Sequence, residues 1–138
     1  ANAHGYNDIG NTYIEVDLSE QHMYFYQNGE DIFESDIVSG DMRYSDRQTP
    51  AGIYTIYYKK SPDVLRGKQL ANGKYEYEQP VTYWMPFNGG FHDANWQPYF
   101  GGDRFMEGGS HGCINMPPEK AAELYNIIDC NIPIVCFY

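Results

Sequence analysis

The strongest constraint on the fold of this chain is a set of short segments in which apolar and polar residues alternate. In residues 13–18, Ile14, Val16 and Leu18 alternate with a tyrosine, a glutamate and an aspartate. Successive side chains of a β-strand point to opposite faces of its sheet, so this period of two predicts a strand. A chain in which such segments dominate is expected to fold around β-sheets.

Strand pairing can be predicted near the N-terminus. An aromatic run at 22–27 leads into Asn28–Gly29, a dipeptide that favours the tight turn of a β-hairpin, and 31–38 follows as the return strand. Residues 12–38 are therefore expected to form a three-stranded meander. Further strands are predicted at 53–59, at 81–87 with an interruption at Pro86, and at 134–138.

One helix is expected near the C-terminus. Pro117–Pro118 suits a helix start, because the first turn has no intrahelical use for the N–H groups that proline lacks. An apolar helix face follows, formed by Ala121, Leu124, Tyr125 and Ile128. The expected fold is therefore mainly β with one substantial helix.

Two segments are expected to lack regular structure or to project from the sheets. Glycine pairs at 89–90, 101–102 and 108–109 predict a loop-rich region in which backbone can approach backbone or ligand closely. Residues 61–79 are polar and broken by glycine, so we expect a long excursion or hairpin that acts as a lid over a groove.

Size and charge limit the domain organisation and the partners. The chain has 138 residues, the size of one domain, and we expect 1–11 to be a tail or linker and 12–138 to be the folded domain. The net charge of −10 argues against a nucleic-acid partner, because cationic contacts to phosphate dominate such binding. No apolar run approaches the ~18 residues of a transmembrane helix.

The three cysteines are an odd number, so at least one thiol has no partner within the chain. Cys130 and Cys136 are expected to be structural thiols that do not pair with each other. Cys113 lies in 92–115, a segment that also holds two of the four histidines. A zinc site is not expected there, because structural zinc requires paired ligands at short spacing.

A cysteine and a histidine in one segment suit nucleophilic catalysis. An imidazole can take the thiol proton, and the backbone N–H groups of Gly112 and Cys113 can stabilise the oxyanion that forms on attack. If the chain turns after Cys113, a helix that begins near residue 118 is expected to favour the thiolate through the positive end of its dipole. An unreactive, buried cysteine is the alternative that these residues leave open.

The segment Ser110-His111-Gly112-Cys113-Ile114-Asn115, preceded by His92, resembles the signature of the L,D-transpeptidase catalytic domain, the YkuD-like family. Thr49-Pro50-Ala51-Gly52 resembles the Thr-Pro-x-Gly turn of that family. The similarity extends from the opening meander at 13–29 to the helix and closing strand at 115–137. It implies an L,D-transpeptidase-type β-sandwich with its helix near the active site.

The resemblance also implies roles for individual residues. Cys113 matches the nucleophile and His92 the base, which the backbone carbonyl of Asp93 orients. The N–H groups of Gly112 and Cys113 match the oxyanion-hole donors. His111 matches a position that shapes the site, and it is also the rival base because it lies nearer to the cysteine in sequence. The residues expected to contact substrate are Ser110, Asn115, Trp84 and Trp96.

The activity that the family implies is cross-linking of peptidoglycan. The thiol attacks the carbonyl before the terminal D-Ala of a tetrapeptide stem, D-Ala leaves, and the amine of a second stem resolves the thioester into a 3→3 cross-link. The implied partners are donor and acceptor stem peptides, with carbapenem-type β-lactams as covalent inhibitors. No metal or organic cofactor is expected. The protein is expected to be a monomer outside the membrane, at the cell wall, with its signal or anchor removed.

Two other functions stay open. An L,D-carboxypeptidase would resolve the same thioester with water, and the sequence does not separate this activity from transpeptidation. A non-catalytic wall-binding module is the second alternative, against which the pair of His92 and Cys113 argues. The remaining histidines, His4 and His22, are expected at the surface.

Overall fold

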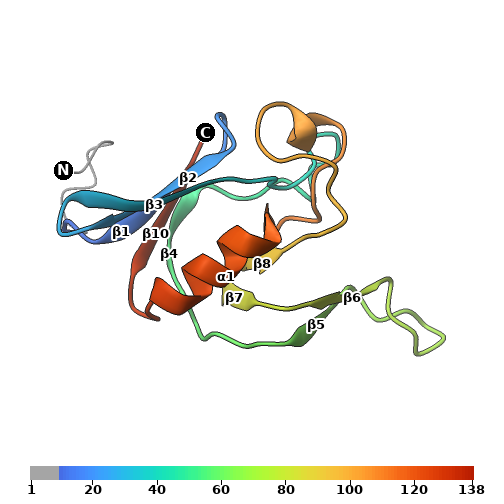
Figure 1. Ribbon diagram of the computed structural model, residues 1–138. Helices are drawn as coiled ribbons and strands as arrows, with labels where there is room; N and C mark the ends of the chain where they lie inside the picture. The colour runs from blue at the N-terminus through green and yellow to red at the C-terminus, as the bar shows by residue number, and fades with distance from the viewer. Residues whose placement is uncertain (1–9) are drawn as a thin grey trace.

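Two β-sheets and a separate two-stranded ribbon make up the domain in the computed structural model, which describes residues 10–138 (Figure 1). The larger sheet has the strand order β3-β2-β1-β10-β4, and the smaller sheet has the order β7-β8-β9. Most of the predicted tail, and His4 with it, lies outside the described residues. The expectation of a mainly β fold is confirmed.

The predicted meander forms one half of the larger sheet. It consists of β1 (Tyr13–Asp17), β2 (His22–Gln27) and β3 (Glu30–Asp36), with the expected turn at residues 28 and 29. β1 pairs antiparallel with β2, and β2 pairs antiparallel with β3. All three strands of the meander were therefore predicted correctly.

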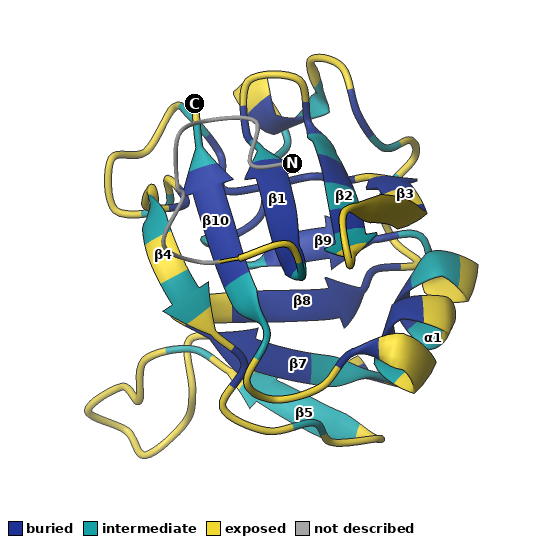
Figure 2. Cartoon of the chain, turned by 90° about the vertical axis from the view of Figure 1, so that its left-hand side faces the viewer, coloured by how far each residue is buried: buried dark blue, intermediate teal, exposed yellow. Residues whose placement is uncertain are grey.

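The other half of the larger sheet comes from distant parts of the chain. β10 (Pro133–Phe137), the predicted closing strand, runs parallel to β1, and β4 (Gly52–Thr55) pairs with the other edge of β10. Figure 2 shows β10 and β1 side by side in front of the smaller sheet, whose strands cross behind them. The N-terminal and C-terminal segments are thus held together at the centre of the sheet.

β4 is shorter than the strand predicted at 53–59. From Ile56 onward the chain leaves the larger sheet, because its amides find acceptors on β7 (Trp84–Phe87) instead. Tyr57 N–H donates to the Pro86 carbonyl at 2.8 Å, and Lys60 N–H donates to the Trp84 carbonyl at 2.9 Å. Segment 56–60 therefore connects the two sheets.

The smaller sheet was predicted only in part. β7 was expected within 81–87, whereas β8 (Gly89–Asp93) occupies a segment that was expected to be a loop, and no strand was predicted at β9 (Ile114–Met116). The prediction of a loop at 89–90 is wrong. Because Gly90 has no side chain, β8 can pack closely against the Trp84 ring on β7. A Cβ atom on Gly90 would lie 2.6 Å from the Trp84 ring.

The long excursion predicted at 61–79 is a hairpin ribbon. β5 (Asp63–Arg66) pairs antiparallel with β6 (Glu78–Val81), and the ribbon projects from the domain in Figure 1. The strand predicted at 81–87 is divided between β6 and β7. The break falls at Thr82 and Tyr83, whose amides donate to the Asp93 carboxylate.

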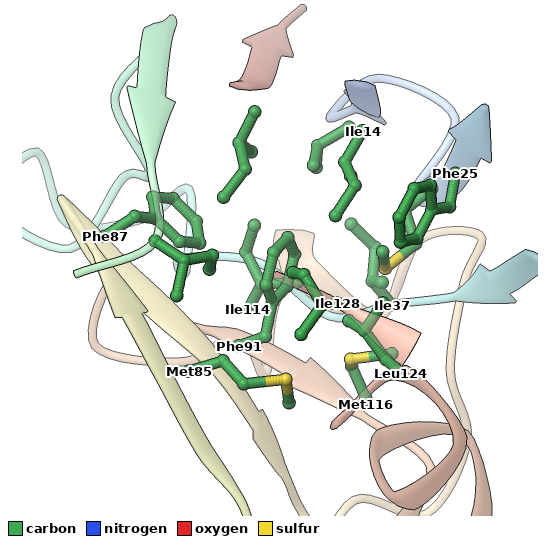
Figure 3. Close-up of a cluster of buried hydrophobic side chains, with 14 of the residues drawn as sticks. Ile14, Phe25, Ile37, Met85, Phe87, Phe91, Ile114, Met116, Leu124 and Ile128 are labelled. Carbon is green, nitrogen blue, oxygen red and sulfur yellow. The ribbon is translucent and has the colours of Figure 1, made fainter. Parts of the chain in front are cut away.

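The register of the smaller sheet separates a core face from a second face. Met85, Phe91 and Ile114 are paired across β7, β8 and β9, and all three are buried in the core between the sheets (Figure 3). Since side chains alternate along a strand, the neighbouring row of Trp84, His92 and Asn115 lies on the opposite face.

The helix is confirmed as α1 (Pro118–Ile127), and it packs against β8. Ala121 and Leu124 are fully buried, as expected for the apolar face. A short 3-10 helix, η2 (Arg104–Met106), lies in the loop between β8 and β9. The C-terminal end of α1 is held by Lys59, whose Nζ donates to two carbonyl oxygens, of Tyr125 at 2.9 Å and Ile128 at 3.0 Å.

Replacing Lys59 by methionine is expected to lower the free energy of unfolding by about 1–2 kcal/mol, because two carbonyls lose a cationic donor. The measurement is urea denaturation followed by circular dichroism. Lys60→Met is the matched control, since the Lys60 side chain is exposed and its ammonium lies 3.4 Å from the Asp63 carboxylate. Equal stability of the two variants would contradict the capping role of Lys59.

Candidate active site

One cavity of about 280 Å³ brings most of the predicted site residues together. It lies on the second face of the smaller sheet, and the β5–β6 ribbon supplies part of its wall. The predicted residues that line it are His92, Trp96, Ser110, His111, Cys113 and Asn115. Residues that were not predicted also line it: Leu65, Tyr77, Gln79, Gln97, Arg104, Gly108 and Gly109.

His92 is held in a defined orientation on β8. Its Nδ1 lies 2.8 Å from the backbone carbonyl oxygen of Asp93, and the side chain is 4% exposed. Donation from Nδ1–H to this carbonyl leaves the lone pair on Nε2. Burial lowers the pKa of His92, although the hydrogen bond to Asp93 acts in the opposite direction. The imidazole is therefore neutral near pH 7 and able to accept a proton.

Two tryptophan rings pack around the imidazole. The ring centroids of Trp84 and Trp96 each lie 5.9 Å from that of His92. Trp96 also lines the cavity, whereas Trp84 is not among the lining residues. Trp84 therefore packs against the imidazole without lining the cavity.

The thiol of Cys113 faces the same cavity in an uncharged form. Burial raises its pKa to about 11. The chain does not turn directly from Cys113 into the helix, because β9 separates Cys113 from the start of α1 and each strand residue advances the chain by ~3.3 Å. The condition under which the helix was expected to favour a thiolate is therefore not met. The resting pair of cysteine and histidine is thus a neutral thiol beside a neutral imidazole.

The turn before Cys113 is closed by the hydroxyl of Ser110. Ser110 Oγ donates to the Cys113 carbonyl and accepts from Gly112 N–H at 3.1 Å. Gly112 has φ of 127°, a conformation that favours glycine. The Gly112 amide is therefore engaged within the turn, whereas Cys113 N–H forms no hydrogen bond within residues 10–138.

His111 and Asn115 line the cavity in different ways. His111 is exposed, and its ring meets Tyr77 edge-on at 4.8 Å. Burial, followed by the nearby Arg47 charge, lowers the pKa of His111. Asn115 is 1% exposed, and its Oδ1 has no hydrogen-bond partner among the described residues. Of the two histidines, His92 has the better-defined orientation for a base.

Two carboxylates support the site through contacts that the sequence did not reveal. The Asp93 carboxylate accepts from the amides of Thr82 at 2.9 Å and Tyr83 at 2.8 Å, so it fixes the start of β7 next to His92. The Asp41 carboxylate accepts from Gly109 N–H at 3.1 Å and from two nitrogens of the Arg43 side chain. The bond from Gly109 to Asp41 joins residues 68 positions apart, and neither contact leaves a local sequence pattern.

The other cysteines lie away from the cavity, and all three thiols are free. Cys136 is buried in β10, and burial raises its pKa to about 12. Cys130 is exposed, so the expectation that it packs as a structural thiol is wrong. His22 is partly exposed on β2, with its ring nitrogens 2.8 Å from the carboxylates of Asp36 and Glu34.

Within residues 10–138, no group of three or more His, Cys, Asp or Glu side chains is placed to hold a metal ion. No helix in that range has both the length and the apolar character needed to cross a membrane.

Comparisons with known proteins agree on the fold and the domain type. The family model for the YkuD, L,D-transpeptidase catalytic domain matches residues 11–135. A crystal structure of an Enterococcus faecium L,D-transpeptidase mutant is 43% identical, with a TM-score of 0.83 over 94% of this chain and 50% of that chain. The chain thus spans about half the length of that relative.

The E. faecium catalytic domain acylated by ertapenem is also 43% identical, with a TM-score of 0.77 over 93% of this chain and 98% of that chain. An L,D-transpeptidase from Mycobacterium smegmatis shares the fold at 22% identity, with a TM-score of 0.75 over 93% of this chain and 59% of that chain. No curated protein sequence matches the chain.

Alkylation of Cys113 in the free protein should be slow at pH 7 and should rise steeply toward pH 10. The reason is that a raised pKa leaves little thiolate at neutral pH, and the thiolate is the nucleophile. The measurement is the rate of iodoacetamide addition in a Cys130→Ser background, mapped by mass spectrometry. A rate that is already constant from pH 7 to 9 would indicate a stabilised thiolate and contradict the neutral resting pair.

Asp41→Asn is expected to destabilise the protein at pH 7 by about 1–2 kcal/mol. The Arg43 side chain holds the pKa of Asp41 at about 2, below its usual 3.8. A depressed pKa in the folded state stabilises the protein above about pH 4, and this contribution is lost as the pH falls toward about 2. Urea denaturation should therefore show the two proteins converging at pH 2. Asp46→Asn, at an exposed position, is the control, and a pH-independent difference for Asp41→Asn would rule out the ionic contribution.

Proposed function

The chain belongs to the L,D-transpeptidase catalytic domain (YkuD) family, and on this basis we propose that it transfers the acyl group of a peptidoglycan tetrapeptide stem through a thioester on Cys113. One observation carries the proposal. Cys113 and His92 line the same cavity, and the histidine is oriented by the backbone carbonyl of Asp93. A nucleophile, a base and an orienting group are the parts that cysteine acyl transfer requires.

The first step is attack of Cys113 Sγ on the carbonyl carbon before the terminal D-Ala. His92 Nε2 takes the thiol proton as the C–S bond forms, because neither group is charged at rest. Negative charge develops on the carbonyl oxygen. The backbone N–H of Cys113 belongs to the same residue as the attacking sulfur, and it is the donor available to stabilise this charge. Gly112 N–H already donates to Ser110 Oγ. It could stabilise the oxyanion only if this hydrogen bond were broken or shared.

Collapse of this intermediate breaks the C–N bond and forms the thioester. The proton on His92 passes to the departing nitrogen, so D-Ala leaves with a neutral amino group. Solvent then protonates this amino group. The side-chain amine of an acceptor stem then attacks the thioester carbonyl and gives a proton to His92. The C–S bond breaks, and His92 returns that proton to Sγ of Cys113, which restores the thiol. The product is a 3→3 cross-link. Water in place of the amine would give a tripeptide, which is the carboxypeptidase alternative.

The charge of the cavity suits a donor that ends in a carboxylate. The chain as a whole is acidic, yet Arg104 is the one Lys or Arg among the residues that line the cavity. Its Nε donates to Gln97 Oε1 at 2.8 Å, which fixes the direction of the guanidinium. A fixed guanidinium is well suited to bind a carboxylate.

The remaining parts of the proposal follow from the substrate. Peptidoglycan stem peptides are the donor and acceptor, and the place of action is outside the membrane, at the cell wall. β-Lactams that acylate the thiol would act as covalent inhibitors, which the ertapenem-acylated relative supports. The wall-binding alternative has no use for an oriented histidine beside a thiol.

The test is incubation of the protein with a disaccharide-tetrapeptide, followed by mass spectrometry of the products. We expect cross-linked dimers that lack one D-Ala, and Cys113→Ala should reduce their formation by at least ~10³-fold because the nucleophile is lost. Cys130→Ala is the matched control, since its thiol is exposed and outside the cavity. Tripeptide as the sole product would mean hydrolysis instead, and unchanged activity in Cys113→Ala would refute the thioester.

A further inference from the structure

The turn at 49–52 is not explained by the proposed mechanism, although Thr49 contacts the loop 110–113 that carries Cys113. Thr49 is 2% exposed and is not among the residues that line the cavity. Its hydroxyl donates to the Gly112 carbonyl at 2.8 Å and accepts from Gly40 N–H at 2.9 Å. Both the donor and an acceptor site of the hydroxyl are therefore used.

The bond from Thr49 determines where Cys113 N–H points. The Gly112 carbonyl and Cys113 N–H belong to the same peptide unit, which is planar and trans, so the two groups point in opposite directions. The carbonyl is directed to the buried Thr49 hydroxyl. Cys113 N–H is consequently directed to the other side, where no described residue accepts its hydrogen bond.

The neighbouring contacts of the loop do not hold this peptide unit by themselves. Ser110 Oγ engages Gly112 N–H and the Cys113 carbonyl, which belong to the two flanking peptide units. Gly112 lacks a Cβ and can adopt a wider range of φ and ψ than other residues. Rotation of the Gly112–Cys113 peptide is thus opposed chiefly by the hydrogen bond from Thr49.

Thr49 is itself anchored on both sides. Its hydroxyl accepts a hydrogen bond from Gly40 N–H, and its backbone carbonyl accepts one from the Tyr138 hydroxyl at 2.7 Å. Segment 39–41 is in turn bonded to the catalytic loop, because Ser110 N–H donates to the Ser39 carbonyl at 2.9 Å. The hydroxyl is therefore a fixed donor rather than one that must be recruited during the reaction.

We propose that Thr49 is a positioning residue that presets the oxyanion hole by fixing the Gly112–Cys113 peptide with Cys113 N–H toward the reacting carbonyl. The inference rests on the proposed function, since it assumes that an oxyanion forms beside Cys113. Thr49 does not touch the substrate and acts through the backbone of the nucleophile. Its loss should therefore slow acylation without changing the reactivity of the thiol toward reagents that form no oxyanion.

The test compares two reactions of the same thiol in Thr49→Val, Thr49→Ser and the native protein. Acylation by ertapenem passes through an oxyanion, whereas alkylation by iodoacetamide at pH 9 does not. Thr49→Val is expected to acylate roughly 10- to 100-fold more slowly, somewhat less than the loss of a whole oxyanion donor. Its alkylation rate should stay within about twofold of the native rate, and Thr49→Ser should restore acylation because it keeps the hydroxyl.

Ser35→Ala is the matched control, because Ser35 is 3% exposed and its hydroxyl donates to the Asp36 carbonyl on β3. It should acylate and alkylate at native rates. Circular dichroism checks that each variant is folded, and Thr49→Ala replaces Thr49→Val if the latter is not. An equal loss in both reactions, or native acylation in the variant that lacks the hydroxyl, would overturn the proposal. Absence of acylation in the native protein would instead refute the proposed function.

Discussion

The parallel pairing of β8 with β9 is the constraint on which the rest of the site depends. It places His92 beside Asn115 on one face of the smaller sheet and Phe91 beside Ile114 on the other. Because Cys113 immediately precedes β9, the same pairing that buries the core row also brings Cys113 to the cavity that His92 lines. A shift of one residue in this register would exchange the two faces, so core packing and site geometry cannot vary independently.

Burial decides the charge state of the site. It raises the pKa of Cys113 and lowers that of His92, so both groups are neutral at rest. In the proposed mechanism, charge then develops only as a substrate carbonyl is attacked. Groups fixed before the reaction therefore matter more than a preformed ion pair. The Asp93 carbonyl orients the imidazole of His92, and the Thr49 hydroxyl holds the Gly112–Cys113 peptide.

The elements predicted from sequence are those with a local signal. The meander and α1 have clear periodicities, and the signature around Cys113 predicted a nucleophile and a base that the structure places in one cavity. β8 and β9 could not be predicted, because one begins with two glycines, the other has three residues, and they pair across a long loop. The contacts of Thr49 and Asp41 with the loop before β9 could not be predicted from the sequence either. Each joins residues more than 60 positions apart, and no periodicity records such a hydrogen bond.

The central claim is that this register makes Cys113 an acyl carrier for a stem peptide. Rapid acid quenching during turnover of a disaccharide-tetrapeptide, followed by peptide mapping, tests it most directly. The predicted result is a disaccharide-tripeptide acyl group on the peptide that contains Cys113, removed by hydroxylamine as expected for a thioester. Turnover without any adduct, or an adduct on the exposed Cys130 alone, would contradict the claim.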